Sequence, residues 1–345
     1  MVISKKREKG TVTNKTKKTK KSKKLNKNTS EKETSIDHST VKKIVVSPQM
    51  TNEEIASKEG HYFDEAHYTT IIREDCDVYK KMPNGKEVLL LRFRKNVLTP
   101  ELCKTGMKHL KKPAMKRHAN RGASAGLLDY SKMPKYVNNP KQHVNPDRFR
   151  IQGYYSKHTG KYVKDSVGNI AQSNILGYFD RKDRNGDNKY NKIPCRTTAF
   201  TRDHEEQWKE VVPLFCEMDL LFKQLTPKKH KKQKIRAHMT DFVISDTAFS
   251  TITINYNWRT ALHKDSGDFQ DGFGNLVVLE EGEYSGGYTG FPQYKVAVDV
   301  REGDFLAMDV HEWHCNTEIT PITKEYTRLS IVAYLREKMI ACKKI

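Results

Sequence analysis

The chain has 345 residues, enough for one large domain or two small ones, and its net charge is +21 at pH 7. Its six cysteines include no C-x-x-C pair, which argues against a zinc ribbon or a disulfide scaffold and favours a reducing compartment. No apolar run is long enough to cross a bilayer and the N-terminus lacks the apolar core of a secretory signal, so we expect a soluble intracellular protein, nuclear if the source is eukaryotic.

Residues 1–60 are predicted to be a disordered, lysine-rich tail. Residues 1–27 hold twelve Lys/Arg and one Glu, a net charge of +11, and the other 318 residues keep +10. Apart from Val41–Val46, the segment has almost nothing from which to build a core. Its lysine pairs are consistent with a nuclear localisation signal, a phosphate-binding arm or a solvated tail. Because the rest of the chain is basic too, we expect a polyanionic partner, most simply nucleic acid.

Residues 61–172 are predicted to form an N-terminal extension. A hairpin is expected over Asp75–Leu91, because a Pro-Asn-Gly turn separates two strand-like runs there. A helix is expected to begin after Thr99, whose hydroxyl can cap a first turn that starts with proline. Residues 131–170 are rich in Pro, Asn, Tyr and Lys and are expected to be irregular.

Two strongly basic stretches are candidates for contacting nucleic-acid phosphates. The first lies between Leu102 and Leu128, contains no acidic residue and is expected to end as a glycine-containing loop. The second follows Pro227 and directly precedes a strand-rich region. A plain solvated surface is the alternative interpretation of the first stretch, and a flexible surface loop that of the second. The candidate residues are Lys112, Lys116, Arg117, Arg121, Lys228, Lys229, Lys231 and Lys232.

The clearest helix is predicted to begin at Asp203. Asp203 and Glu206 have the spacing of a capping box, and the apolar residues that follow recur with the helical period. Pro213 lies within this run and predicts a kink or two shorter helices, and Pro227 is expected to end it. We expect such a helix to support the outside of a β-core.

From Phe242 onward, short β-branched segments alternate with Gly and Asp turns, which is typical of a sandwich or jelly roll. Together with the preceding helix, residues 173–345 are predicted to be one domain, and the fold class is mostly β (α+β). The expected strands are Phe242–Ile244, Phe249–Tyr256, Asn275–Leu279, Tyr294–Val300, Phe305–Met308 and Arg328–Tyr334.

Three residues of this domain have the pattern of an iron site. His263 and Asp265 are two residues apart, so their side chains lie on the same face of an extended segment. A later histidine on a neighbouring strand would complete two imidazoles and one carboxylate, the facial triad of a non-haem Fe(II) oxygenase. Both His311 and His314 are candidates for this third ligand. The imidazoles must be neutral, so we expect metal binding to weaken at acid pH.

Arg328 is predicted to bind a co-substrate carboxylate. It lies one expected strand beyond the distal histidine, and its planar guanidinium can hold a carboxylate bidentately. Ser330 faces the same way and can share that carboxylate. The apolar neighbours of Arg328 favour this inward-facing role over a surface ion pair.

A set of spaced elements resembles the double-stranded β-helix core of the 2-oxoglutarate- and Fe(II)-dependent dioxygenases. These elements are His263-x-Asp265, Gly286-Gly287, Gly303-Asp304, His314 and Arg328-x-Ser330. Within that superfamily, Asn255–Asp268 and Met308–Asn316 are most similar to the TET/JBP branch. Members of this branch oxidise the methyl group of 5-methylcytosine or thymine in nucleic acid. The resemblance extends from Ser173 to Arg336.

The resemblance implies Fe(II) as the metal, with 2-oxoglutarate and O2 as co-substrates. It favours His314 as the third ligand, because the branch has an aromatic residue before this histidine and an asparagine two residues after it. The implied substrate is a base in nucleic acid, most simply DNA, that is flipped out of the duplex or presented in a single strand. A prolyl or lysyl hydroxylase and a non-catalytic nucleic-acid-binding protein are the competing functions. The candidate residues for contacting the substrate are Asn255, Asn257, Asp268 and His311.

Overall fold

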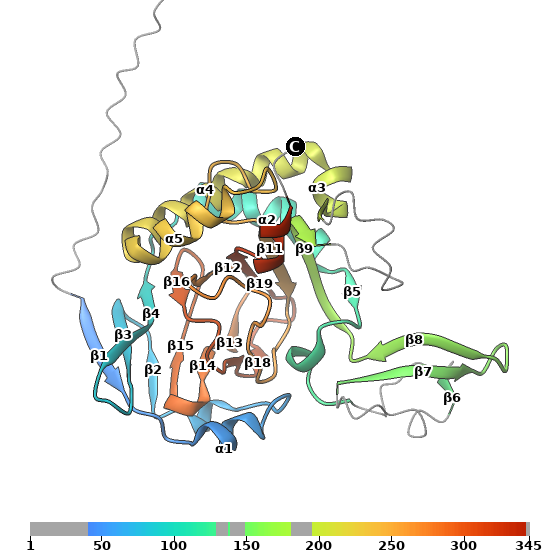
Figure 1. The fold of residues 1–345 in the computed structure, drawn as a ribbon, viewed down its shortest axis with the longest axis horizontal. Helices are drawn as coiled ribbons and strands as arrows, with labels where there is room; N and C mark the ends of the chain where they lie inside the picture. The colour runs from blue at the N-terminus through green and yellow to red at the C-terminus, as the bar shows by residue number, and fades with distance from the viewer. Residues whose placement is uncertain (1–40, 129–136, 139–148, 181–194, 343–345) are drawn as a thin grey trace, which may run out of the picture. The chain divides into compact units, whose positions relative to one another are not determined.

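A ten-stranded sheet forms the centre of the structure, a computed structural model that describes residues 41–128, 137–138, 149–180 and 195–342 (Figure 1). Nine of its strands follow one path, and β5 (Arg117–His118) pairs with β9 beside it. The path is β1 (Lys42–Val46), β3 (Cys76–Lys81), β4 (Glu87–Arg94), β16 (Phe305–Met308), β12 (Gly274–Glu281), β19 (Thr327–Tyr334), β11 (Thr251–Tyr256), β9 (Ala171–Asp180) and β10 (Cys195–Thr197).

A smaller four-stranded sheet completes the β-core. Its order is β17 (Cys315–Asn316), β14 (Thr289–Phe291), β15 (Val296–Val298) and β2 (Thr70–Ile72), and β13 (Tyr284–Gly286) pairs separately with β18 (Ile319–Pro321). Buried side chains of both sheets, such as Leu276 and Leu306 from one and Phe291 and Val296 from the other, belong to one apolar cluster. The predicted mostly β fold with a double-stranded β-helix core is therefore confirmed.

Helices cover the large sheet. α2 (Pro100–Ala114) contacts several central strands and packs on α4 (Glu205–Leu225), which in turn packs on α5 (Pro227–Ala237) (Figure 1). The apolar side chains of α4 that recur at helical spacing, such as Phe215 and Phe222, are fully buried, and each is worth about 1.5–3 kcal/mol of transfer free energy. The shorter helical segments are α1 (Asn52–Ala56), α3 (Ala199–Asp203) and 3-10 turns at Glu65–His67, Gly122–Ala125, Pro292–Tyr294 and Glu337–Ala341.

The helix predicted to start at Asp203 begins two residues later. Asp203 is instead the last residue of α3, where its carboxylate accepts hydrogen bonds of 2.7 and 2.8 Å from Arg202. His204 occupies the N-cap position of α4 and makes no capping hydrogen bond through its side chain. Pro213 lies inside α4 without dividing it. The predicted capping box is therefore wrong, because Asp203 is the last residue of α3 and the N-cap position of α4 falls on His204. The two-helix alternative is wrong because α4 is continuous through Pro213.

The N-terminal extension contributes strands to both sheets. The predicted hairpin is confirmed as β3 and β4, and Thr99 caps α2 as expected by accepting a hydrogen bond of 3.4 Å from the Leu102 amide. Part of the segment predicted to be disordered is ordered, since β1 pairs with β3 and Ile55 of α1 is fully buried. The rest of that prediction, for residues 1–40, lies outside the described residues.

Two other segments also differ from their predictions. The region expected to be irregular contains a hairpin of β7 (Arg150–Ser156) and β8 (Tyr162–Gly168), with β6 (Val137–Asn138) beside it. Its tyrosine- and valine-containing sequence favours strands, and Gly160 supplies the positive φ of +62° that the turn needs. The segment Phe242–Ile244 forms no strand and follows helix α5 as a loop.

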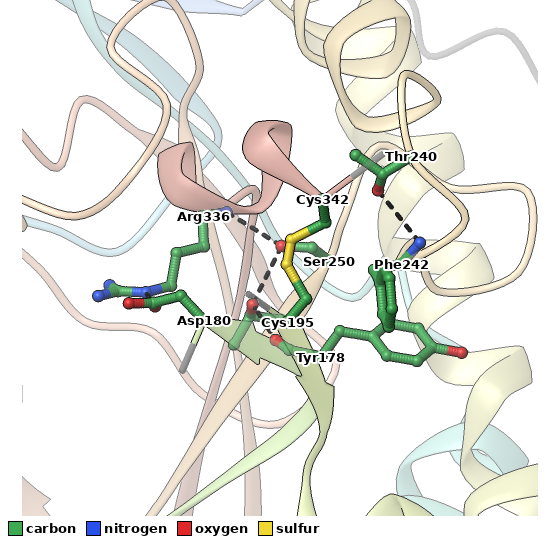
Figure 2. The surroundings of a disulfide bond; sticks show 9 residues. Tyr178, Asp180, Cys195, Thr240, Phe242, Ser250, Arg336 and Cys342 are labelled. Atoms are coloured by element: carbon green, nitrogen blue, oxygen red, sulfur yellow. Dashed lines mark hydrogen bonds and ion pairs between the residues drawn. A yellow bond between two sulfur atoms is a disulfide. The ribbon is translucent and has the colours of Figure 1, made fainter. Parts of the chain in front are cut away.

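A disulfide joins Cys195 on β10 to Cys342 near the C-terminal 3-10 turn (Figure 2). Both cysteines lie in an apolar cluster with Met339, and Tyr178 and Phe242 pack against it. The other four cysteines are free. This single crosslink is not a disulfide scaffold, but it departs from the fully reduced state expected from composition. The two residues are 147 positions apart, so no local sequence motif indicates that they pair.

Among the described helices, none has the length and apolar character that crossing a membrane requires.

Candidate metal centre and substrate cavity

Main-chain pairing brings His263 and His314 together. His263 follows β11, His314 precedes β17, and the amide of each donates a hydrogen bond of 3.0 Å to the carbonyl of the other. Their ring centroids are 4.4 Å apart. Asp265 stands two residues after His263, and its amide donates 3.0 Å to the Val310 carbonyl. Two segments of the β-core therefore hold all three residues by their backbones.

The donor atoms of His263, Asp265 and His314 converge within 4.8 Å of one another, in the one cluster of this kind among the described residues. The Nδ1 atoms of the two histidines lie 2.8 and 2.9 Å from the carbonyls of Ala261 and Glu312. These contacts leave both Nε2 atoms facing Asp265, at 3.7 and 3.8 Å from its carboxylate oxygens. Two imidazoles and a carboxylate in this arrangement are a donor set suited to a divalent iron ion.

The environment keeps the His263 imidazole neutral. Burial lowers its pKa to about 4, and the neighbouring His314 acts in the same direction. A neutral imidazole has a lone pair ready for a metal, so binding at neutral pH requires no loss of a proton from this side chain.

Arg328 lies buried on β19 with an unsatisfied donor. Its Nη2 donates 2.9 Å to the Gly287 carbonyl, while its Nε has no hydrogen-bond partner among the described residues. Ser330, two residues along the same strand, lines a cavity that also includes the metal-binding candidates. Arg328 itself is absent from that lining, and its buried, unpaired N–H is a donor to which a carboxylate could bind.

The two asparagines predicted to contact substrate lie in different surroundings. Asn255 lines the cavity, where its Nδ2 donates 3.1 Å to Ser330 Oγ. Asn257 is absent from the lining, and both ends of its amide bind the backbone, with Oδ1 accepting 2.6 Å from the Arg328 amide and Nδ2 donating 3.1 Å to the Tyr326 carbonyl. The structure thus gives Asn257 a turn-forming role in place of the predicted substrate contact, in keeping with its φ of +44°.

The metal-binding candidates open into a cavity of about 2240 Å³. Arg121, from the N-terminal extension, is part of the cavity lining and donates a hydrogen bond from Nη2 to Ser173 Oγ. Its Cζ lies 5.9 Å from the centroid of the Trp258 ring. Its Nε has no hydrogen-bond partner among the described residues, and burial lowers its pKa. Six cationic and four acidic residues line the cavity: Arg117, Arg121, Arg196, Arg202, Lys264 and Arg336 against Glu59, Asp180, Asp265 and Asp268.

Asp268 and His311 differ in their relation to the cavity. Asp268 lines it, and burial together with the nearby Asp265 charge raises its pKa well above the usual value. His311 is absent from the lining, and its Nδ1 lies 3.4 Å from Asp309 Oδ1. Of the two histidines left open by the spacing, the structure therefore places His314, and not His311, beside His263 and Asp265.

The predicted basic residues separate into two groups. Arg117 and Arg121 line the cavity, whereas Lys112, Lys116, Lys228, Lys229, Lys231 and Lys232 do not. The four lysines after Pro227 belong to helix α5, so the flexible-loop alternative is wrong. Lys232 pairs with Asp271 at 3.2 Å, and burial lowers the pKa of Lys229. The structure places this basic run outside the cavity.

Comparison with known proteins finds a family match in the second half of the chain. Residues 174–337 match the Tet_JBP family, described as the oxygenase domain of the 2OGFeDO superfamily. This segment is therefore similar to a Tet/JBP oxygenase domain, and it is called by that name below. The lining of the cavity extends beyond this domain, since Arg117 and Arg121 lie before the first residue of the domain.

Curated relatives of this chain include proteins from Trypanosoma and Leishmania. Thymine dioxygenase JBP1 of Trypanosoma brucei brucei is 38% identical over 172 residues, which are 49% of this chain and 20% of that protein. Bifunctional helicase and thymine dioxygenase JBP2 of Leishmania tarentolae is 36% identical over 167 residues, 48% of this chain and 15% of that protein. The chain thus spans about a fifth or less of these relatives. A solved structure of NgTET1 in complex with 5mC DNA aligns with a TM-score of 0.48 at 11% identity, covering 89% of this chain and 86% of that one.

Proposed function

We propose that the chain is a 2-oxoglutarate- and Fe(II)-dependent dioxygenase that oxidises the methyl group of a pyrimidine base in DNA. The observation that carries the proposal is the convergence of His263, Asp265 and His314 in a large cavity that the Tet/JBP oxygenase domain shares with the extension and that has more cationic than acidic residues in its lining. Neither feature alone distinguishes this function from a metal-binding or a nucleic-acid-binding protein. Together they support an oxidising centre within reach of a nucleotide.

Within this proposal, His263, Asp265 and His314 hold Fe(II), and Arg328 and Ser330 bind the distal carboxylate of 2-oxoglutarate. The unpaired Nε of Arg328 supports the second assignment, because a carboxylate would satisfy it. When bound, iron and 2-oxoglutarate supply the O2-dependent oxidising chemistry.

The chain's own residues orient these groups and shape the site. The carbonyls of Ala261 and Glu312 accept hydrogen bonds from the Nδ1–H groups of the two histidines, which directs each Nε2 to the metal. Apolar side chains of Leu276, Met308 and Val332 are also part of the cavity lining and offer a surface for the apolar part of a substrate. The protein thus contributes position, charge and an apolar surface.

The cavity favours a nucleic-acid substrate over a small molecule. Drug-sized ligands occupy pockets of about 300–1,000 Å³, and this cavity of about 2240 Å³ has room for a base with its sugar and phosphates. Its arginines suit phosphate oxygens, which determine most of the affinity of such complexes. A methyl group on a stacked base cannot reach the metal, so the base must be flipped out or single-stranded. The names of the curated relatives favour thymine, with 5-methylcytosine as the other methylated pyrimidine.

Succinate production tests the proposal directly. The full chain is incubated with Fe(II) and 2-oxoglutarate and with thymine-containing DNA, 5-methylcytosine DNA, DNA lacking both bases, or a basic peptide. We expect succinate above background with one of the first two, and mass spectrometry of digested nucleosides identifies the oxidised base. Turnover with the peptide alone would replace this function by that of a protein hydroxylase.

A DNA substrate also implies that the protein works in the nucleus if its source is eukaryotic.

A further inference from the structure

A buried lysine from β3 holds the loop that carries His314. Lys80 is 8% exposed, and its Nζ lies 2.6 Å from Glu312 Oε1 and 3.2 Å from Asp309 Oδ2. One ammonium group therefore bridges two carboxylates of the same loop. Both carboxylates are mostly buried, with side-chain exposures of 15% for Asp309 and 18% for Glu312.

The second oxygen of Glu312 is held as well. The Tyr294 hydroxyl donates a hydrogen bond of 2.8 Å to Glu312 Oε2. Within the loop, the Glu312 amide donates 3.2 Å to the Asp309 carbonyl. Buried charges are stable only when paired and hydrogen-bonded, and here both oxygens of Glu312 have a partner. The side chain and main chain of Glu312 are consequently fixed together.

The backbone of Glu312 is also the contact that orients His314. Its carbonyl lies 2.9 Å from His314 Nδ1, and two residues earlier the Val310 carbonyl accepts 3.0 Å from the Asp265 amide. The Asp309–Glu312 turn thus provides carbonyl hydrogen-bond partners for two of the three proposed metal-binding residues. A shift of Glu312 would move the imidazole of His314 relative to the Asp265 carboxylate.

We infer that Lys80 is a positioning residue for the metal site, which acts by fixing the Asp309–Glu312 turn and through it the direction of His314. This inference rests on the proposed function. Lys80 touches none of the three metal-binding candidates and lies far before residue 174, where the Tet/JBP oxygenase domain begins. The extension therefore completes a site whose ligands all belong to the domain. Removing a group that hydrogen-bonds a ligand directly typically costs about 10–100-fold in metal affinity, and Lys80 acts one contact further from the ligand, so we expect an effect near the lower end of that range.

Loss of Lys80 also removes the cation from two buried carboxylates, so the protein becomes less stable whether or not the metal site is affected. Stability alone therefore does not test the inference. The measurement that separates the two roles is the Fe(II) dissociation constant of the full chain, measured without oxygen by competition with a chelator. The melting temperature of the metal-free protein is measured alongside it.

Lys80→Met is expected to raise the Fe(II) dissociation constant by up to about tenfold, the lower end of the range for groups that contact a ligand directly. Lys80→Arg, which retains the cation, is expected to restore part of the affinity. Arg94→Met is the matched control, because Arg94 pairs in a buried position with Asp77 on the same hairpin, at 2.9 Å. The control is expected to lower the melting temperature without changing the Fe(II) dissociation constant.

Tyr294→Phe provides a milder test if Lys80→Met does not fold. It removes one hydrogen bond to Glu312 and no charge, and we expect a rise of a few-fold in the dissociation constant. Unchanged Fe(II) affinity in the folded Lys80 or Tyr294 variants, with affinity lost in His314→Ala, would overturn the positioning role and leave the proposed function intact. A wild-type chain that binds no Fe(II) would overturn both.

Discussion

The amides of His263 and His314 each donate to the carbonyl of the other at 3.0 Å, although β12 to β16 lie between the two residues in the chain. Their approach therefore depends on main-chain hydrogen bonds and not on contact between the imidazoles. Since the side chains take no part in this pairing, we expect the β-core to keep its fold when either imidazole is removed. Substitutions at His263 and His314 can therefore test metal binding separately from folding.

His314→Ala is expected to abolish measurable Fe(II) binding and turnover while the melting temperature of the metal-free chain stays close to that of the wild type. His311→Ala is the comparison, because His311 lies three residues away and points to Asp309 instead. It is expected to keep Fe(II) binding within an order of magnitude. Metal titration of both variants measures the difference, and loss of binding in His311→Ala alone would exchange the two assignments.

Arg328→Lys is expected to weaken 2-oxoglutarate binding by about 10–100-fold, since hydrogen bonds to a charged group are worth about 1.5–3 kcal/mol. Lysine keeps the charge and loses the fork that matches a carboxylate. Calorimetric titration of the metal-loaded chain with 2-oxoglutarate gives the affinity, and Fe(II) binding serves as the internal control. Equal 2-oxoglutarate affinity in variant and wild type would remove Arg328 from the co-substrate site.

Arg121→Gln is expected to weaken binding of a single-stranded oligonucleotide and to reduce the slope of its salt dependence by about 1. The reason is that Arg121 brings a partly unsatisfied guanidinium into the cavity. Lys231→Gln changes the charge equally on helix α5, outside the cavity, and is expected to have little effect. Oligonucleotide affinities of both variants, measured at several salt concentrations, give the two salt-dependence slopes to be compared. An effect of Arg121→Gln on 2-oxoglutarate alone would assign this arginine to the co-substrate.

Asp309 is expected to stabilise the protein in a pH-dependent way. Burial raises the pKa of this carboxyl, but hydrogen bonds from His311 and Lys80 outweigh it and lower the pKa to about 2. The folded state thus favours the carboxylate relative to the unfolded chain, whose pKa is about 3.9. This contribution, about 2 kcal/mol, is present above about pH 4 and is lost as the pH falls through about 2.

Asp309→Asn tests this contribution. The variant is expected to lose about 2 kcal/mol of unfolding free energy at pH 7, and its difference from the wild type is expected to shrink between pH 4 and pH 3. Urea unfolding of the metal-free proteins at pH 7, 4 and 3 provides the comparison. A difference that stays constant over this range would show that the carboxylate is not selectively stabilised.

Local chemistry explains which parts of the fold were predictable. The β3–β4 hairpin has a Pro-Asn-Gly turn between strand-like runs, and Thr99 precedes a proline that suits a first helical turn. Asp203 failed as a capping residue because the short helix α3 ends on it and the N-cap position of α4 falls on His204. The sequence pattern predicts no separate helix before Asp203.

The sequence by itself determined the residue types and spacing of the candidate site, since His263-x-Asp265 and Arg328-x-Ser330 depend only on the alternation of side chains along a strand. The resemblance to a family favoured His314 over His311, and tertiary structure brought His314 beside His263 and Asp265. Only tertiary structure turned the Asn257 amide to the backbone and brought Arg121 to the cavity and Lys80 to the turn before His314. These outcomes depend on which strands become neighbours in the two sheets. Pairing between distant segments leaves no periodic or local signal in the chain.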